Sequence, residues 1–583
     1  MTDESGSTPG NSALARRLHL DVRTDFDVEI PMRDGVVLRS DIYRPVGPEP
    51  VPALLFRTPY DKRRPQASLM GLDIRAANAR GYAVVAQDVR GRFASDGDYL
   101  MSAAQQVEGA DGYDTIEWIA AQPWCSGAVG MYGVSALGMA QWMAACERPP
   151  SLRAIIPEKT GSSGRGALML DSVLITWTAL QAMDWVEKAM KRQEAGEKEL
   201  AIVQQALMNP QASARHLPLN DMPLKQIPGL PTIQEMIDLL HSQSRLDIAS
   251  IQVPVLISSG WYDMGTTETA QHYETLLQRT SAGTNNETNI LFGPWDHRGN
   301  GYAVGELFFG FFADSTIAGI PGLYLDFLDR HLKGDTSKSA PGARYFVMGA
   351  NEWRSSPTWP PANHPRLMYL LSRGSANGWA GDGRLSSEPP PAEMPADRYR
   401  YDPLSPSPSF GGRYLDLGGS RSGPFDQRRV EERADVLVYT GDLLKSALEI
   451  AGSIKLRVFV SCSTPDTDLT AKLCDVHPNG FSYNILDEFF RLRWREGYDK
   501  TALLEPGRVY EFEIDMGPVA HRFQAGHRMR LQITSSAFPA YDRNMNTGHD
   551  IGVDAEGPVA EVTIFHDAAR STRLMLPVLT DRG

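Results

Sequence analysis

The hexapeptide GVSALG at residues 133–138 places Ser135 among small residues. It follows the apolar run 129–132 and leads into residues 136–147, which are typical of a helix. A serine at a strand-to-helix turn sits in a strained backbone that projects its Oγ outward, and small neighbours are needed where the backbone passes close. The pattern predicts a nucleophilic serine. Because Leu137 stands where a second glycine is usual, a serine in an ordinary tight β–α turn remains the alternative.

Two later apolar strands end in residues that would activate such a serine. The run 255–262 is followed by Asp263, and the run 290–296 is followed by His297. A serine hydroxyl is a weak nucleophile until an imidazole takes its proton, and a carboxylate holds that imidazole in the right tautomer. The order Ser, Asp, His along the chain is that of serine enzymes with a strand-to-helix nucleophile. We prefer Asp263 to Asp296 as the acid, because Asp296 adjoins the histidine in the chain.

The elements that must position these residues alternate between strand and helix. Short apolar runs at 52–56, 82–86, 129–132, 154–156, 253–258 and 289–292 are typical of strands buried on both faces of a mainly parallel sheet. A helix is predicted over 111–122, between two of them. This alternation predicts an α/β fold, in which ligands bind at the carboxyl ends of the strands.

Two further regions have different patterns. Residues 161–249 show helical periodicity without a convincing strand, as expected of a helical cap inserted over the sheet. From about residue 356 the period becomes two, as in 454–460 and 510–516, which is typical of a β-sandwich or jelly roll. We therefore predict a flexible tail at 1–20, an α/β-hydrolase core at 21–160 and 250–355, a helical cap at 161–249 and a C-terminal β jelly roll at 356–583.

Composition narrows the choice of partners. The formal net charge of −13 disfavours nucleic acid or an anionic membrane surface as the main partner. The N-terminal residues show no signal peptide, and no run approaches the roughly 18 apolar residues of a membrane span. The four cysteines form no C-x-x-C pair and are expected to be reduced. These features predict a cytoplasmic protein, and a homo-oligomer is compatible with them.

Several ordered motifs carry a resemblance to a known family. They include MRDGV at 32–36, TPYDK at 58–62, QDVRG at 87–91, GWYD at 260–263, GPWDH at 293–297 and SSAFPAYDRN at 535–544. With the segment around Ser135, they resemble the cocaine esterase family of bacterial serine esterases, which is related to X-Pro dipeptidyl-peptidases and α-amino-acid ester hydrolases. The resemblance implies the same fold and triad. It also implies an oxyanion hole made by the Tyr60 hydroxyl and the Ala136 N–H, two donors aimed at charge that develops in the transition state. Taken without the resemblance, Tyr60 is better explained as a packed tyrosine with a satisfied hydroxyl.

The chain departs from that family around the expected substrate pocket. Ala136 stands where a tyrosine is common, and Met264-Gly265 stand near the place of an aromatic residue. Trp177 matches an aromatic residue that lines the acyl pocket, with ordinary helix packing as its alternative. We expect Trp177, Met264 and Gly265 to contact a substrate whose acyl group differs from benzoyl.

The residues and the resemblance together predict hydrolysis of small-molecule carboxylic esters through an acyl-enzyme on Ser135. The alternative is an amide-cleaving acylase or X-Pro-type peptidase that uses the same triad, although the sequence shows no acidic anchor for a substrate ammonium. A carbohydrate-binding protein with an inert core is a third hypothesis, which the complete triad disfavours. No spacing of cysteine, histidine and carboxylate residues indicates a metal site, and no glycine-rich phosphate loop is present, so we expect no cofactor.

Overall fold

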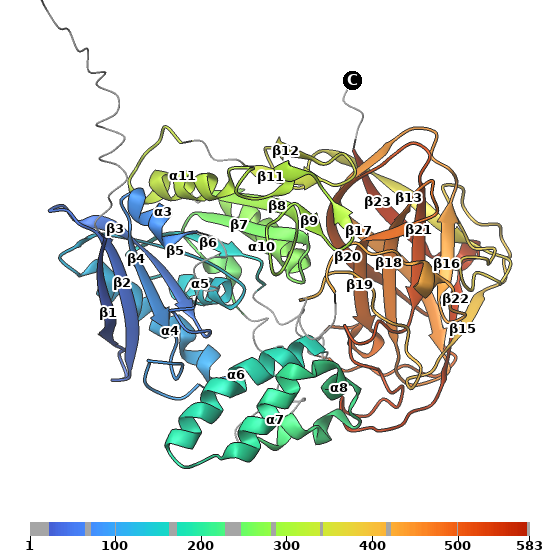
Figure 1. Ribbon diagram of the computed structural model, residues 1–583. Helices are drawn as coiled ribbons and strands as arrows, with labels where there is room; N and C mark the ends of the chain where they lie inside the picture. The colour runs from blue at the N-terminus through green and yellow to red at the C-terminus, as the bar shows by residue number, and fades with distance from the viewer. Residues whose placement is uncertain are drawn as a thin grey trace, which may run out of the picture.

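The computed structural model describes residues 22–64, 72–99, 101–161, 172–227, 246–281, 287–338, 342–415, 421–497 and 500–579. The predicted tail at 1–20 lies outside these ranges. A mixed sheet of ten strands forms the N-terminal part of the molecule, in the spatial order β1-β2-β4-β3-β5-β6-β7-β8-β11-β12 (Figure 1). Its strands are β1 (Val22–Pro31), β2 (Val37–Pro45), β3 (Val51–Thr58), β4 (Ala83–Asp88), β5 (Cys125–Val134), β6 (Leu152–Glu158), β7 (Val255–Tyr262), β8 (Thr288–Asp296), β11 (Ala343–Val347) and β12 (Glu352–Ser356).

The central strands from β4 to β11 run parallel, whereas β1, β2 and β12 are antiparallel to their neighbours. Parallel strands are buried on both faces, which is why they read as continuous apolar runs in the sequence. The carboxyl ends of β3, β5, β6, β7 and β8 therefore lie along one edge of the sheet.

Helices cover both faces of this sheet, and the alternation of side chains along each strand separates two hydrophobic clusters. Leu55, Ile155 and Ile257 pack with side chains of α4, α5 and α10 on one face. Leu54 and Ile156 pack with side chains of α3 and α11 on the other. The helices are α3 (Ile74–Ala79), α4 (Met101–Ala120), α5 (Ala136–Cys146), α10 (Thr266–Ser281) and α11 (Ile320–Leu332). The helix expected at 111–122 is thus the second half of α4, which begins ten residues earlier.

Between β6 and β7 the chain forms a separate group of helices. These are α6 (Ser172–Lys191), α7 (Glu197–Met208) and α8 (Pro210–Arg215), and Figure 1 shows them along one side of the molecule, next to both larger parts. Their buried residues form a cluster of their own that includes Val186 and Val203, and this cluster also holds Trp494 and Ile551 from the C-terminal part. Parts of the predicted cap, residues 162–171 and 228–245, lie outside the described residues.

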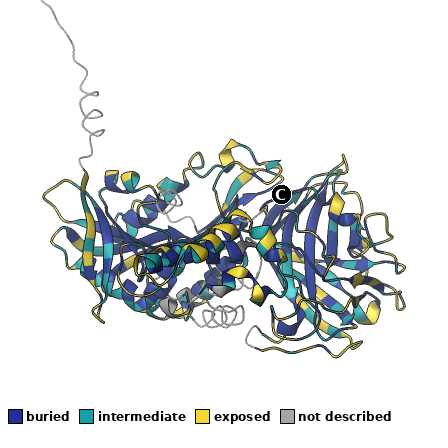
Figure 2. Cartoon of the chain, turned by 60° about the horizontal axis from the view of Figure 1, so that its bottom comes forward, coloured by how far each residue is buried: buried dark blue, intermediate teal, exposed yellow. Residues whose placement is uncertain are grey.

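The C-terminal part is built from an eleven-stranded sheet in which β14 and β16 are the parallel pair and the other pairs are antiparallel. Its interior is lined by alternate residues of the strands, and Figure 2 shows buried residues along the strands of both parts of the molecule. The strands are β13 (Asn363–Leu371), β14 (Arg384–Ser386), β15 (Asp397–Tyr401), β16 (Leu437–Gly441), β17 (Leu448–Cys462), β18 (Asp468–Val476), β19 (Ser482–Arg491), β20 (Tyr510–Phe523), β21 (Arg528–Thr534), β22 (Ala560–Phe565) and β23 (Arg573–Leu579).

Aromatic side chains join the two sheets. The Trp261 ring on β7 stacks on Phe292 with ring centroids 4.6 Å apart, and it also packs against Trp359, which leads into β13. Arg413 from the C-terminal part is buried and donates from Nε to the Trp261 carbonyl over 3.0 Å. The end of β7, which precedes Asp263, is therefore held by ring packing and by a hydrogen bond from the C-terminal part.

No helix in the described ranges is long and apolar enough to cross a membrane. The four cysteines form no disulfide.

Candidate active site

Ser135 lies at the turn between β5 and α5, in a backbone conformation that L-residues rarely adopt. Its φ is 60° and its ψ is −125°. The turn is held by the Ser135 N–H, which donates to the Glu158 carbonyl at 2.9 Å, and by the Gly138 N–H, which donates to the Ser135 carbonyl at 2.8 Å. A strained residue that the surrounding hydrogen bonds over-determine is typical of a functional site.

The glycines around Ser135 are required by close packing. A Cβ added to Gly133, whose φ is +141°, would lie 2.6 Å from the Leu137 Cβ. A Cβ added to Gly138 would lie 2.4 Å from Cγ2 of Thr160, which follows the neighbouring strand β6. Gly138, which comes one position later than the usual second glycine, therefore allows α5 to pack closely against the end of β6.

Asp263 and His297 are in direct contact at the ends of the adjacent strands β7 and β8. Asp263 Oδ2 lies 2.5 Å from His297 Nδ1, and both side chains are buried. The other oxygen, Oδ1, accepts the Gly265 N–H at 2.7 Å. Burial acts to raise the pKa of Asp263, but the charge and hydrogen bond of His297, together with the charge of Lys159, outweigh it and hold the pKa below its usual value. The carboxyl is thus an ionised partner for the imidazole.

The rival acid, Asp296, is bonded elsewhere. Its Oδ1 accepts the N–H groups of Arg298 and Gly299 at 3.1 and 3.0 Å. Its Oδ2 accepts the Ser422 hydroxyl at 2.7 Å, which ties the loop after β8 to the C-terminal part.

The strand between those of Ser135 and Asp263 contributes two charged residues that the sequence analysis missed. Glu158 is the last residue of β6 and Lys159 follows it, and both are buried. Lys159 Nζ donates to the Gly299 carbonyl at 3.0 Å, two residues beyond His297, and Glu158 Oε1 accepts the Asn300 amide at 2.8 Å. Burial lowers the pKa of Lys159, and the nearby carboxylates of Glu158, Asp263 and Asp296 oppose that effect. The pair fixes the loop that carries His297.

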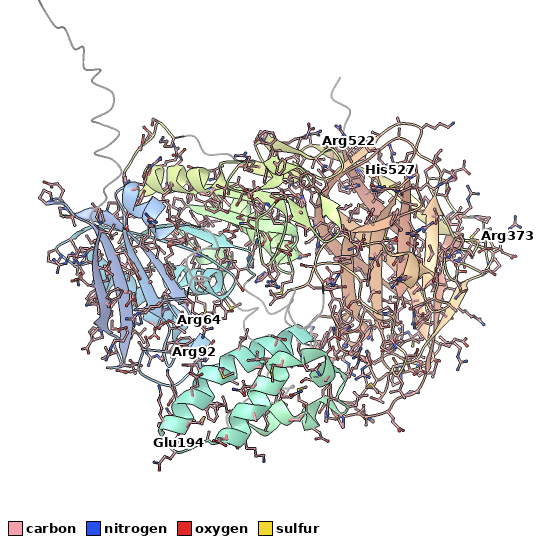
Figure 3. The ribbon with its side chains drawn as sticks, in the orientation of Figure 1. Arg64, Arg92, Glu194, Arg373, Arg522 and His527 are labelled. Atoms are coloured by element: carbon pink, nitrogen blue, oxygen red, sulfur yellow. The ribbon has the colours of Figure 1, made fainter. Side chains whose placement is uncertain are left out.

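Tyr60 follows β3, the strand next to β5, and is half-buried against the hydrophobic cluster of α3 and α11. Its N–H donates to Thr58 Oγ1 at 3.0 Å, and the carbonyl of the preceding Pro59 accepts Arg92 Nε at 3.0 Å. Arg92 Nη1 also lies 3.5 Å from Asp184 on α6. Figure 3 shows Arg92 between the sheet and the helical group. Arg92 therefore links the Tyr60 loop to α6.

The other residues predicted for the oxyanion hole and the substrate pocket lie on α5, α6 and the turn after β7. Ala136 opens α5, so its N–H is one of the first four that no intrahelical carbonyl accepts. Gly265 is buried beneath Asp263 and holds that carboxylate through its N–H, whereas Met264 is half-buried. Trp177 belongs to α6, but its side chain lies outside what the structure describes.

Four neighbouring parallel strands thus deliver a strained serine, a buried lysine, a carboxylate and a histidine to one edge of the sheet. A carboxylate-bound imidazole and a strained serine at the same edge of a sheet are the groups that nucleophilic acyl transfer uses. Within the described ranges, the group of side chains spaced to hold a metal ion lies elsewhere, in the C-terminal part, and consists of Asp475, His477 and His527.

Comparison with known proteins gives the family. The chain is 36% identical over 585 residues to the cocaine esterase of Rhodococcus sp. (strain MB1 Bresler), an alignment that covers 95% of this chain and 98% of the relative. The chain belongs to the cocaine esterase family. Residues 34–299 match the X-Pro dipeptidyl-peptidase (S15 family), and residues 336–575 match the X-Pro dipeptidyl-peptidase C-terminal non-catalytic domain. The enzyme is accordingly a carboxylic ester hydrolase.

Solved structures agree on the fold. An aminopeptidase from a marine sediment Thaumarchaeota archaeon is 25% identical, with a TM-score of 0.75 and coverage of 100% of this chain and 99% of that one. An α-amino acid ester hydrolase superposes with a TM-score of 0.74 at 24% identity, covering 99% of this chain and 98% of that one. The predicted α/β-hydrolase-type core with a C-terminal domain is confirmed.

Proposed function

We propose that this member of the cocaine esterase family hydrolyses small-molecule carboxylic esters through an acyl-enzyme on Ser135. The observation that carries the proposal is the contact of 2.5 Å between Asp263 Oδ2 and His297 Nδ1. These residues follow β7 and β8, and β6 separates those strands from β5, which leads to Ser135. With Nδ1 bound to the carboxylate, Nε2 of His297 is the nitrogen left to take a proton from the serine.

The proposed reaction has two halves. Ser135 Oγ attacks the ester carbonyl carbon while His297 Nε2 accepts the hydroxyl proton, and that proton then passes to the departing alkoxide, which leaves as an alcohol. Water attacks the acyl-serine with His297 again as the base, and the carboxylic acid and Ser135 are released. The Ala136 N–H and the Tyr60 hydroxyl stabilise the oxyanion in both halves.

The domain assignment made from the sequence also enters this proposal. We assign the α/β-hydrolase core to 21–160 and 250–355, a helical cap to 161–249 and a jelly roll to 356–583. The position of α6–α8 between β6 and β7 supports a cap over the carboxyl edge of the sheet, where Trp177 and Met264 would contact the acyl group. The antiparallel strands of the C-terminal part support the jelly roll.

Amide hydrolysis is the second candidate, because residues 34–299 match a peptidase family and one similar structure is an aminopeptidase. The two reactions share the triad and differ in the leaving group. A panel of p-nitrophenyl esters, p-nitroanilides and X-Pro amides separates them. Turnover confined to the esters is expected, and faster cleavage of X-Pro amides would favour the peptidase.

Covalent labelling tests the nucleophile. A fluorophosphonate probe should label one residue, Ser135, as identified by peptide mass spectrometry. Ser135→Ala should abolish the labelling and lower kcat by about 10⁶ with folding unchanged, since triad residues act as a unit. The neighbouring variant Ser151→Ala is the matched control, because the Ser151 hydroxyl bonds to Glu117 outside the site. Turnover retained in purified Ser135→Ala would exclude Ser135 as the nucleophile.

A further inference from the structure

Four titratable side chains converge at one end of the C-terminal sheet, in a place that the esterase reaction does not use. Asp475 Oδ1 lies 2.8 Å from His527 Nδ1, and Asp475 Oδ2 lies 3.0 Å from His521 Nε2. His477 Nε2 is 3.9 Å from the same Oδ2, and the ring centroids of His477 and His527 are 4.4 Å apart. Three histidines therefore surround one carboxylate. Figure 3 labels His527 at the end of the C-terminal part remote from the helices α6–α8.

The backbone holds these residues in place independently of any ligand. Asp475 is near the end of β18, and His477 begins the β18–β19 turn, where its N–H donates to the Phe481 carbonyl at 2.8 Å. His527 precedes β21, and its carbonyl accepts the Leu444 N–H at 2.9 Å. His521 belongs to β20. Two turns and two strands thus place four side chains that are distant in the sequence against one another.

The cluster combines one buried carboxylate with a histidine that reaches solvent. The Asp475 side chain is 4% exposed and lies within hydrogen-bond distance of His521 and His527. His477 is 30% exposed and opens the cluster to solvent. An ion could enter from that side.

We propose that Asp475, His477 and His527 bind a divalent transition metal ion, with Zn²⁺ as the best match to two imidazoles and one carboxylate. Zinc takes nitrogen ligands at about 2.0–2.1 Å and carboxylate oxygens at about 2.0–2.2 Å, with a fourth position left for water. The three ligand atoms lie within 4.8 Å of one another, so small side-chain rotations bring them to the spacing of a tetrahedral site. The ion displaces the proton that joins His527 Nδ1 to Asp475 Oδ1, and that proton is released to solvent.

His521 has the role of an outer partner in this site. By holding Asp475 Oδ2, it leaves Oδ1 directed toward His527, and such supporting hydrogen bonds orient the ligands of metal sites. The other ring nitrogen of His521, Nδ1, is buried and has no hydrogen-bond partner within the described residues. An unpaired buried nitrogen of this kind is commonly satisfied by an ordered water or an ion.

The ion would stabilise the strand of the C-terminal part that contacts the core. The backbone around His521 bonds to the end of β11, because the Met348 N–H donates to the Ala520 carbonyl at 3.1 Å and the Met348 carbonyl accepts the Arg522 N–H at 2.8 Å. A metal that links β18, the β18–β19 turn and the β20–β21 turn therefore stabilises the strand that contacts the core. Its effect is on stability and not on the esterase reaction.

Zinc titration of the full-length, chelator-treated enzyme tests the proposal. Calorimetry should show one equivalent of Zn²⁺ bound, and His477→Gln or His527→Gln should weaken binding by about 100-fold or more. His521→Gln should weaken it by about 10–100-fold. His549→Gln is the matched control, because it removes a histidine that pairs with Asp554 at 3.0 Å in the same part of the chain but outside the cluster. His297→Gln should also keep the site, which separates it from the triad.

Two further measurements keep the test decisive if a variant folds poorly. Zn²⁺ should raise the melting temperature of the wild-type enzyme but not that of His527→Gln, since a ligand stabilises only the state that binds it. Anomalous scattering from a zinc-soaked wild-type crystal should place a peak between Asp475 and His527. The absence of stoichiometric zinc binding to the wild type, or an ion located elsewhere, would overturn the proposal and leave a hydrogen-bonded histidine–carboxylate cluster.

Discussion

His297 Nδ1 and Asp263 Oδ2 are 2.5 Å apart, and both residues come directly after neighbouring parallel strands. The contact depends on the sheet, because the carboxyl ends of β7 and β8 lie at the same edge. It also depends on Gly265, whose N–H holds the other carboxylate oxygen at 2.7 Å. The imidazole is therefore oriented by a carboxylate that is itself fixed by the backbone, as preorganised catalytic groups require.

Substitution of the two candidate acids separates their roles. Asp263→Asn should lower kcat by about 10⁴, because an amide holds the imidazole in the wrong tautomer. Asp296→Asn should change kcat less than about 10-fold, since its contacts are to Arg298, Gly299 and Ser422. Steady-state ester hydrolysis measures both. If Asp296→Asn were the more damaging change, the acid would have to be reassigned.

Lys159 should act as a positioning residue for His297. Lys159→Met removes both the hydrogen bond to the Gly299 carbonyl and a positive charge near Asp263. We expect kcat/KM to fall about 10-fold, the cost of roughly one hydrogen bond to a charged group. Loss of the positive charge raises the pKa of Asp263. As the pH is lowered, the variant should therefore lose activity at a higher pH than the wild type does.

A lysine at another site, Lys333, controls for the loss of an amine and its charge. Lys333→Met removes a lysine whose Nζ lies 2.8 Å from Asp329 at the end of α11, away from the triad. It should leave the pH profile unchanged. Identical pH profiles for Lys159→Met and the wild type would show that Lys159 contributes only to packing.

His272 should make the enzyme sensitive to acid. It is buried in α10, where its ring meets Trp142 edge-on with centroids 5.2 Å apart, and burial lowers its pKa to about 4 from 6.5. Between these values the unfolded chain binds a proton that the folded protein does not, so the free energy of unfolding decreases as the pH falls. The decrease is about 1.4 kcal/mol per pH unit within this window, and it is complete below the folded-state pKa.

Chemical denaturation at several pH values measures this effect. His272→Gln should flatten the dependence of the unfolding free energy between pH 6.5 and pH 4, because glutamine takes up no proton. Above pH 6.5 the free energy of unfolding should depend on pH in the same way in the variant and the wild type. A wild-type slope that persists in His272→Gln would assign the acid sensitivity to other groups.

The sequence predicted the residues at strand ends because a buried strand that ends in a polar residue is visible as a pattern. The same signal precedes Glu158 and Lys159 at the end of β6, yet charged residues are ordinarily solvent-exposed, and their burial depends on packing that no local pattern records. Asp475 and His477 are separated by one residue, but His521, on β20, and His527, in the turn that follows it, come more than 40 positions later. Only the pairing of β18 with β21 and β17 with β20 places them together.

The ends of helices were harder to predict from the sequence than their presence. The helix expected at 111–122 begins at Met101. Its large apolar side chains Ile116, Trp118 and Ile119 lie in the second half, whereas the first half carries mainly small and polar residues and gives a weaker signal. Gly138 illustrates the opposite case. Its position, one residue later than usual, reads as a departure in the sequence, and the structure explains it by the close approach of Thr160.

Tyr60→Phe tests the proposed oxyanion hole. Attack by Ser135 converts the ester carbonyl oxygen into an oxyanion, for which the Ala136 N–H is one donor at the start of α5. A second donor must come from another strand end, and Tyr60 follows β3, the neighbour of β5 in the sheet. Deleting its hydroxyl should lower kcat by roughly 10²–10³, or about 2.7–4 kcal/mol. KM should change much less, because this hydrogen bond strengthens mainly in the transition state.

A matched tyrosine distinguishes this effect from lost packing. Tyr43 is partly buried against the same hydrophobic cluster as Tyr60, so Tyr43→Phe makes the same chemical change outside the site. It should leave kcat within about 3-fold of the wild type, and both variants should keep the wild-type melting temperature, as expected when a substitution leaves the packed ring in place. Near-normal kcat in Tyr60→Phe would require another second donor. Equal losses in the two variants would instead attribute the effect to the packing of the loop after β3.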